Sequence, residues 1–323
     1  MNIWKTRLTE LLGIRYPVIQ GGLAHLAYSE LAAAVSNAGG LGQLTAMTCA
    51  SPEALRAEIQ KMREMTPHPF GVNFAIGQHG RPYMDYLRIA IEEEVPVVTI
   101  TGGNPAPVLK ALEGTPIKKL VLVSSRRQAQ KAESLGADAV MAVGFEGGGH
   151  LGRDDVGSLV LIPQVVDAVR IPVVASGGIG DGRGFMAAMA LGADGIEMGT
   201  RFIATKECVA AHPAYKQMLL EADETSTVVI KKSLGMPARA LKNAWTDRIA
   251  ALEAEGGGYE ALKDYISGDA NRRLIHQGDR ETGFGWAGQI VGRIHDVPTV
   301  AELFERMFKE AEAIRKAWAL GAL

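Results

Sequence analysis

Short apolar runs alternate with helical patterns over the first 208 residues of the chain. Eight of these runs are rich in small and β-branched residues and show little polar alternation, which is typical of strands buried on both faces. They span residues 16–22, 41–47, 70–76, 96–103, 118–125, 139–145, 171–178 and 195–202. Segments of helical periodicity lie between these runs, a few residues from each. This order predicts an α/β protein with a parallel sheet.

The number of strand-then-helix units favours one architecture. Eight units in the first 208 residues fit a closed (β/α)8 barrel, the TIM barrel. A doubly wound open sheet is the alternative, and it usually carries a GxGxxG fingerprint after its first strand. Gln20, Gly21 and Gly22 do not continue into that fingerprint. The barrel is therefore the prediction.

Two of the predicted helices have marked ends. One has Ser29 as its expected N-cap and ends near Gly39 and Gly40. The next has Ser51 as its expected N-cap and Pro52 at its first helical position.

The alternation of predicted strands and helices ends at about residue 208. Residues 209–288 contain helical patterns and one short β-prone run, STVVIKK (226–232), which predicts a mainly helical cap on a barrel built by residues 1–208. Residues 289–323 include an amphipathic pattern from Val297 onward that predicts a long helix. We expect this segment to return to the barrel or to pack against a second subunit, which would make the protein a homodimer.

Composition narrows the class of protein. The chain is 47% hydrophobic and 22% charged with a net charge of −2, which gives no sign of a nucleic-acid or membrane partner. Cys49 and Cys208 lie far apart without metal-ligand spacing, so we expect neither a disulfide nor a zinc site. No secretory signal and no uncharged apolar stretch of about 18 residues is evident, so a cytoplasmic location is expected.

Candidate catalytic chemistry follows the sixth predicted strand. The segment GFEGGGHLGRDD (144–155) places His150 behind three glycines, with Glu146 and Asp154 nearby. Imidazole titrates near neutral pH, so His150 is a candidate general base or hydrogen-bond donor. A histidine with a purely structural role is the alternative.

Glycine and hydroxyl residues follow the next two predicted strands. Barrels commonly bind a phosphate between the loops after strands seven and eight. A helix expected to begin near residue 182 would add free backbone N–H groups. Tight turns alone would also explain these glycines. The candidates are Ser176, Gly177, Gly178, Gly199 and Thr200.

The remaining strand ends carry further polar residues. Asn73 ends the third predicted strand and Gln20 ends the first, and either side chain can hydrogen-bond the edge of a heterocycle. His25 follows the first strand and Ser124 ends the fifth, so both are candidates to line a substrate pocket. Since the C-terminal ends of barrel strands share one mouth, these residues are expected to face one cavity.

Taken together, the motifs resemble the flavin-dependent nitronate monooxygenase family. The shared segments are QGGL (20–23), NAGGLG (37–42), FGVN (70–73), GADAVMAVGFEGGGHLG (136–152), ASGGIGDGRG (175–184), LGADGIEMGTRF (191–202), ARALKNAW (238–245) and WAGQIVG (286–292). The resemblance implies FMN, with its phosphate held by Gly177, Gly178, Gly199 and Thr200. It places Gln20, Gly21, Gly22 and Asn73 near the isoalloxazine ring and His150 on the reactive side of the flavin.

The resemblance also implies a reaction on a small molecule. A nitronate monooxygenase oxidises alkyl nitronates with O2, and this is the activity we expect first. The GRDD sequence after His150 resembles the members that are NAD(P)H:quinone reductases, which take electrons from NADH or NADPH. The same motifs are compatible with a flavin-type enoyl-acyl-carrier-protein reductase and with a non-catalytic FMN-binding protein.

Overall fold

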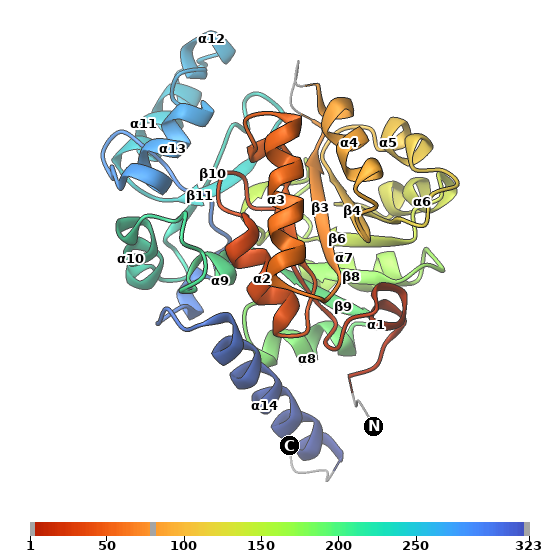
Figure 1. Cartoon of the computed structure of the whole chain (residues 1–323). Helices are drawn as coiled ribbons and strands as arrows, with labels where there is room; N and C mark the ends of the chain where they lie inside the picture. Colours follow the sequence, from red (N-terminus) through yellow and green to blue (C-terminus); the bar gives the residue numbers. More distant parts are fainter. Residues whose placement is uncertain (1–3, 78–81, 320–323) are drawn as a thin grey trace.

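A closed barrel of parallel strands forms the centre of the protein (Figure 1). The computed structural model describes residues 4–77 and 82–319. Its barrel strands are β1 (Val18–Gln20), β2 (Gly42–Thr45), β3 (Phe70–Ala75), β4 (Val97–Thr101), β5 (Lys118–Val123), β6 (Ala139–Val143), β8 (Val173–Ser176) and β9 (Gly195–Met198). They follow in the order β1-β9-β8-β6-β5-β4-β3-β2, and a parallel bridge between Ile19 and Leu41 joins β1 to β2. The predicted TIM barrel is thereby confirmed.

Apolar side chains fill the barrel near its N-terminal end. Ile19, Leu41, Val97, Leu120, Met141 and Val174 form one buried cluster. Helix α1 (Arg7–Leu12) adds Leu8 and Leu12 to this cluster, and Arg7 pairs with Asp194, just before β9, at 2.7 Å. Because this end is packed and covered, space for a ligand lies at the opposite mouth, where the C-terminal ends of the strands meet.

Helices surround the barrel. They are α2 (Ser29–Asn37), α3 (Pro52–Met65), α4 (Tyr83–Glu92), α5 (Ala106–Ala111), α6 (Arg126–Ser134), α7 (Ser158–Val166) and α8 (Gly182–Ala190). The predicted cap of α3 is confirmed, since Ser51 Oγ accepts from the N–H of Ala54 at 3.2 Å. The predicted cap of α2 is wrong, because Ser29 is the first helical residue and Tyr28 stands at the N-cap. Ser29 is buried beside α3, where its N–H donates to Glu58 at 3.0 Å.

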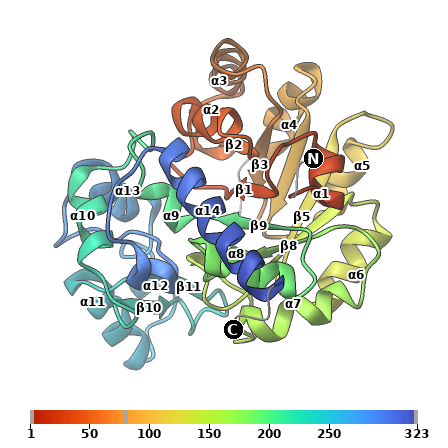
Figure 2. The same cartoon turned by 90° about the horizontal axis from the view of Figure 1, so that it is seen from below.

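The last helix, α14 (Val300–Ala319), completes the ring of helices. After β9 the chain forms the short helix α9 (Thr200–Ile203) and then leaves the barrel. Helix α14 occupies the position beside α8 and contacts α2 as well (Figure 2). Its approach to α8 is close, since a Cβ at Gly182 would lie 2.5 Å from the carbonyl oxygen of Met307. The apolar face of α14 is therefore covered by the barrel of the same chain.

The cap forms a separate group of elements, on the left in Figure 1. Its helices are α10 (Pro213–Glu221), α11 (Ala244–Ala254), α12 (Tyr259–Leu262) and α13 (Gly268–Gln277). Strands β10 (Thr227–Ile230) and β11 (Ala238–Leu241) pair antiparallel within it. Strand β11 also pairs with β7 (Gly149–His150), which belongs to the loop after β6. This three-stranded sheet ties the cap to the loop that carries His150.

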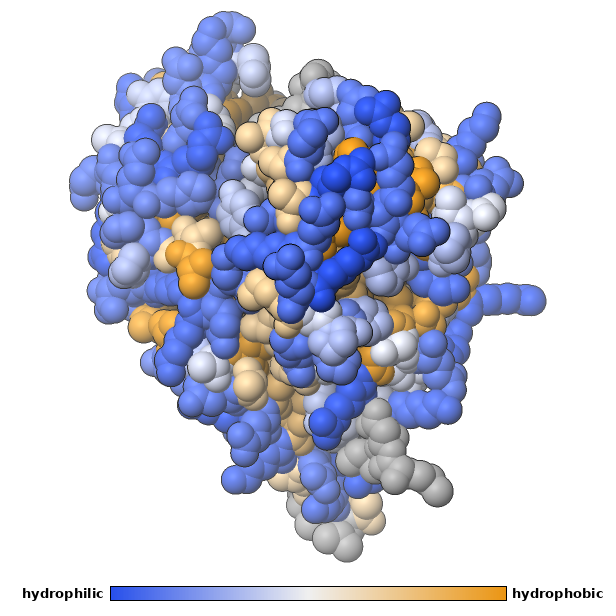
Figure 3. Space-filling model, viewed as in Figure 1, coloured by the Kyte–Doolittle hydropathy of each residue, from blue (hydrophilic) through white to orange (hydrophobic). Residues whose placement is uncertain are grey.

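The face seen in Figure 3 is largely hydrophilic, with small apolar areas between polar ones. In residues 4–77 and 82–319 no helix is long and apolar enough to cross a membrane. The same ranges contain no group of three or more His, Cys, Asp or Glu that could hold a metal ion.

Cys49 and Cys208 are free thiols, and burial raises the pKa of each to about 11.

Candidate active site

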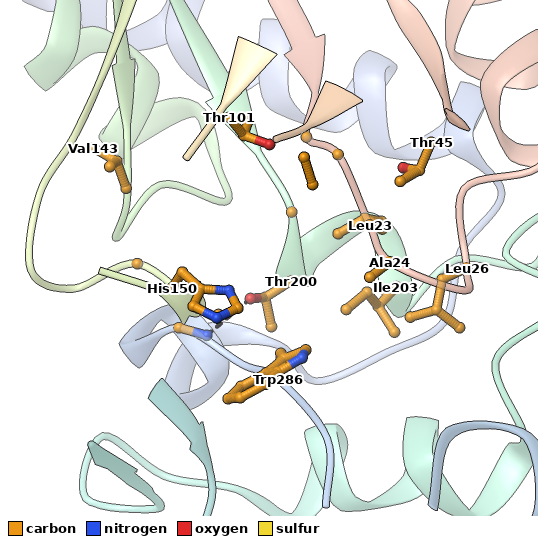
Figure 4. A pocket seen from close by; sticks show the side chains of 18 of the residues that line it. Leu23, Ala24, Leu26, Thr45, Thr101, Val143, His150, Thr200, Ile203 and Trp286 are labelled. Atoms are coloured by element: carbon orange, nitrogen blue, oxygen red, sulfur yellow. Dashed lines mark hydrogen bonds between the residues drawn. The ribbon is translucent and has the colours of Figure 1, made fainter. Parts of the chain in front are cut away.

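A cavity of about 440 Å³ lies between the C-terminal ends of the barrel strands and the cap (Figure 4). This volume is within the usual range for a cofactor or substrate site. In Figure 4, Thr45 and Thr101 lie at the strand ends on one side, and His150 and Trp286 lie across the cavity from them. The lining includes these sequence-predicted residues: Gly21, Gly22, His25, Asn73, His150, Ser176, Gly177, Gly178, Gly199 and Thr200.

Two predicted site residues, Gln20 and Ser124, do not line the cavity. Gln20 is fully buried, and its side-chain amide donates to the carbonyl oxygens of Gly21 at 2.7 Å and Gln43 at 3.1 Å. Its Oε1 accepts from the N–H of Gln43 at 3.1 Å, so the side chain joins β1 to β2. Ser124 Oγ donates to Gln128 Oε1 at 3.0 Å, on α6. Both side chains are held by these structural hydrogen bonds.

Backbone N–H groups are gathered at the glycine-rich part of the rim. Gly177 and Gly178 have φ values of +91° and +76°, which favour glycine. A Cβ at Gly177 would also lie 3.0 Å from the carbonyl oxygen of Gly144. In the described part of the chain, the N–H groups of these two residues, and those of Gly199 and Thr200, donate to no protein acceptor. Free N–H groups around a concave backbone suit an anion such as a phosphate.

The start of α8 does not belong to this donor set. The sequence predicted that the helix near residue 182 would leave its first N–H groups free for a phosphate. Instead the N–H of Gly184 donates to Asp181 Oδ1 at 2.9 Å, and that of Gly182 donates to Glu310 Oε2 at 2.8 Å. Two carboxylates therefore cap this helix, one from its own N-cap and one from α14. That part of the prediction is wrong.

On the opposite side of the cavity, polar side chains at the strand ends are joined by hydrogen bonds. Asn73 Nδ2 donates to Thr99 Oγ1 at 2.9 Å, and Thr99 Oγ1 donates to Gln43 Oε1 at 2.5 Å. Gly22 lies directly against Asn73, since a Cβ there would come within 2.4 Å of Asn73 Oδ1. Because Gly22 has no side chain, a flat group can come close to the amide of Asn73. Such a surface is suited to the edge of a planar heterocycle.

A buried carboxyl group, Glu197, also lines the cavity. It lies on β9, opposite Ser176 of the neighbouring strand β8, and is only 6% exposed. Burial raises the pKa of this carboxyl from 4.5 to about 7. The sequence analysis missed Glu197, although a glutamate inside the apolar run GIEM was a usable signal, because buried strands rarely hold an unpaired acid.

His150 is held at the mouth by the sheet that joins barrel and cap. It pairs with Ala238 of β11, and its ring lies 5.7 Å from the ring of Trp286. The side chain is exposed to the cavity, yet the surrounding protein and the charge of Lys231 lower the pKa of its imidazole to about 4. Water in an open cavity moderates this shift, and a bound occupant strengthens it. The ring is therefore uncharged at neutral pH.

Lys231 is the second functional residue that the sequence analysis missed. Its Nζ lies 2.8 Å from Nε2 of His150 and 5.5 Å from the centre of the Trp286 ring. The side chain is buried, and burial lowers the pKa of its amine to about 8. The only sequence signal was a lysine at the end of the run STVVIKK, and nothing in the sequence connected it to a residue 81 positions earlier.

The two acids near His150 in sequence have other positions. Glu146 accepts from the N–H of Ser158 at 2.9 Å, and Ser158 Oγ donates to it at 3.1 Å. Glu146 therefore caps α7 instead of orienting His150. Asp154 is exposed. Neither carboxylate forms a hydrogen bond with the imidazole of His150. Its hydrogen-bond partner is Lys231.

A closed barrel with a donor-rich glycine rim and a histidine at its mouth defines the class of protein, which is an α/β-barrel protein with a small-molecule site at the C-terminal ends of its strands. The chain belongs to the nitronate monooxygenase family, whose model matches residues 5–81 and 75–310. The family expected from the sequence motifs is thus confirmed.

Individual relatives carry different names. A probable nitronate monooxygenase of Staphylococcus saprophyticus is 33% identical, over 96% of this chain and 98% of that protein. A (3aS,4S,5R,7aS)-5-hydroxy-7a-methyl-1-oxo-octahydro-1H-indene-4-carboxyl-CoA dehydrogenase of Rhodococcus jostii is 34% identical, over 100% of this chain and 99% of that protein. Among solved structures, FabK from Thermotoga maritima is 39% identical with a TM-score of 0.92, over 99% of both chains.

Proposed function

We propose that the protein binds FMN in this cavity and oxidises alkyl nitronates with O2. The observation that carries the proposal is that the free N–H groups of the glycine rim and the imidazole of His150 line the same cavity. When bound, FMN supplies the electron transfer that no side chain of this cavity can perform alone. The protein residues bind, orient and exclude water.

The residues present fit FMN at both of its ends. The N–H groups of Gly177, Gly178, Gly199 and Thr200 form a cradle for a phosphate, and a side chain on either of the first two would strain the backbone. At the other end, the isoalloxazine ring would lie against Gly22, where the side-chain amide of Asn73 can hydrogen-bond its edge. Ser176 and Gly21 line the cavity between these two places. These are the residues we assign to the cofactor.

The substrate is placed on the side of the cavity nearest the cap. His150 there acts as a hydrogen-bond donor to the nitronate oxygen, and Trp286 covers the space beside it. His25 lines the same cavity from the loop after β1. We assign His25 to the substrate pocket and His150 to the reaction itself.

Two measurements test this proposal. The purified protein, incubated with FMN and desalted, is expected to retain the flavin absorbance. Under air it should consume oxygen with propionate 3-nitronate or propyl-2-nitronate, whereas NADH under argon should leave the flavin oxidised. A protein that cannot hold FMN would refute the proposal, and a protein that holds FMN without any turnover would support the non-catalytic alternative.

A second candidate is a reductase that takes electrons from NADH or NADPH. It is favoured by the apolar cap side of the cavity, where Ile266, Ile275 and Phe284 offer a surface for an uncharged chain. Rapid bleaching of the flavin by NADH or NADPH under argon would support this activity. Quinones and crotonyl-type thioesters, supplied as acceptors in the same assay, would then distinguish quinone reduction from enoyl reduction.

A further inference from the structure

We propose that Lys231 is a positioning residue that fixes His150 in the form with its proton on Nδ1, so that His150 donates a hydrogen bond and does not act as a base. The inference rests on the proposed function, because it concerns the same cavity and substrate. It also assigns to Lys231 the charge that attracts the anionic oxygen of the substrate.

The chemistry of the two groups determines the direction of their hydrogen bond. An ammonium group has three N–H donors and no acceptor, so Nε2 of His150 must accept across the 2.8 Å contact. A neutral imidazole has one nitrogen with a free lone pair, and here that lone pair is already used. Nδ1 therefore carries the proton. While Lys231 stays charged, no nitrogen of His150 is available to remove a proton from a substrate.

The fold holds the two residues in this arrangement. Ile230, Ala238 and His150 lie side by side on β10, β11 and β7, and Lys231 follows Ile230 directly. Lys231 has a φ of +62°, a strained conformation for a residue with a side chain. Its N–H donates to Glu253 Oε2 at 2.8 Å, which holds the backbone there. Strain retained beside a cavity is frequently part of a functional site.

The charges around the pair leave the ammonium available to an anion. In the described ranges, no carboxylate lies within ion-pair distance of Lys231 Nζ. Glu253 is turned to the backbone N–H groups of Lys231 and Ser233. The guanidinium of Arg239 on β11 is turned to the carbonyl oxygen of Phe145 and to Thr227 Oγ1. Lys231 is therefore a buried cation whose charge an anionic substrate would offset.

The proposal has a consequence for the substrate. A neutral nitroalkane must lose a C–H proton before it can be oxidised as a nitronate, and His150 has no lone pair to receive that proton. We propose that the proton leaves in solvent, before binding, and that neither His25 nor Glu197, which also line the cavity, replaces His150 as a base. The protein should therefore use alkyl nitronates far better than the parent nitroalkanes, and the preference should depend on Lys231.

The experiment compares the FMN-loaded protein with its K231M and K231R variants. In protein with ¹⁵N- and ¹³C-labelled histidine, the His150 imidazole should show the Nδ1–H form at pH 7. In K231M its pKa should rise by about one unit or more, because the neighbouring positive charge is gone. K231R keeps the charge and should keep the low pKa. An unchanged His150 pKa in a folded K231M variant would overturn the inference.

Turnover gives the second readout. Wild-type protein should prefer propyl-2-nitronate to 2-nitropropane by about 100-fold or more in kcat/KM, and K231M should narrow this ratio by at least about tenfold through a raised KM for the nitronate. Equal use of both substrates by the wild type would overturn the inference. Retention of FMN with no turnover of either compound would instead refute the proposed function, while the imidazole titration would still decide how Lys231 and His150 are paired.

Discussion

Thr200 Oγ1 accepts a hydrogen bond of 2.9 Å from the N–H of Gly288, which joins the end of the last barrel strand to a segment 88 residues further along the chain. Gly288 directly precedes the 3₁₀ helix η2 (Gln289–Arg293), and the N–H of Gln289 donates to the carbonyl oxygen of Glu146 at 2.9 Å. One short segment thus contacts both the proposed phosphate rim and the loop of His150. The late segment is part of the site, although it is far from both in sequence.

A methyl group at Gly288 should disturb this junction. In Gly288→Ala the new Cβ would lie 2.8 Å from the carbonyl oxygen of Glu146 and 3.0 Å from the N of Gly148, so backbone has to move. We expect a loss of about 1–3 kcal/mol of stability and a clear loss of FMN affinity. Thermal unfolding and titration with FMN measure these two effects. Gly258→Ala is the matched control, because its Cβ meets no described atom within 4 Å. Equal FMN affinity in both variants would contradict a role for Gly288 at the rim.

The glycine rim can be tested with a pair of glycines that have similar backbone conformations. Gly178 has a φ of +76° and lines the cavity, and Gly114 has a φ of +77° with no described atom within 4 Å of its Cβ. Alanine at either position should cost about 1 kcal/mol of stability, because both need the left-handed region. Only Gly178→Ala should weaken FMN binding, by about tenfold or more. If Gly114→Ala weakened FMN binding as much, general destabilisation would explain the effect and the rim assignment would fail.

Removal of the imidazole should affect turnover more than cofactor binding. In His150→Ala the hydrogen-bond donor at the mouth is lost, and we expect kcat/KM for propyl-2-nitronate to fall by about 100-fold or more. The flavin spectrum should remain, since the cradle for the phosphate lies on other strands. His68→Ala removes an exposed histidine and should leave the rate unchanged. Full activity in His150→Ala would show that His150 is not catalytic.

Glu197 should make stability depend on pH. Burial raises the pKa of its carboxyl from 4.5 to about 7, so the folded protein keeps a proton that the unfolded chain releases between these two values. The folded state binds more protons in this window, and its stability should therefore fall as pH rises from about 4.5 to about 7. The total effect is on the order of 3 kcal/mol, since each pKa unit corresponds to about 1.4 kcal/mol.

The variant Glu197→Gln isolates this contribution. It cannot ionise, so the protein without FMN should unfold at a higher temperature than wild type above pH 7, with the difference shrinking toward pH 5. Glu281→Gln changes an exposed acid and serves as the control. A difference between Glu197→Gln and wild type that stayed constant across this range would show that the carboxyl of Glu197 does not titrate there.

Much of the barrel was predictable because each unit carries local information. The apolar runs of β3, β4 and β6 appear at the predicted places, and Ser51 with Pro52 marks a helix start that depends only on neighbouring residues. Ser29 did not follow the same rule, because contact with α3 placed it inside the helix. The division of the chain near residues 208 and 288, and the assignment of individual residues to cofactor and substrate, stay predictions.

The sequence by itself determined the barrel, the family and the set of strand ends that meet around the cavity, because parallel strands buried on both faces place their C-terminal ends together whatever their side chains are. Only the tertiary structure decided which polar residues face the cavity and which are used to hold the fold. Gln20 joins two strands and Glu146 caps a helix, whereas Glu197 and Lys231 line the cavity. The physical reason is that a polar side chain near the core binds a partner that lies within hydrogen-bond distance. Such partners come from distant parts of the chain, as the contact between His150 and Lys231 shows.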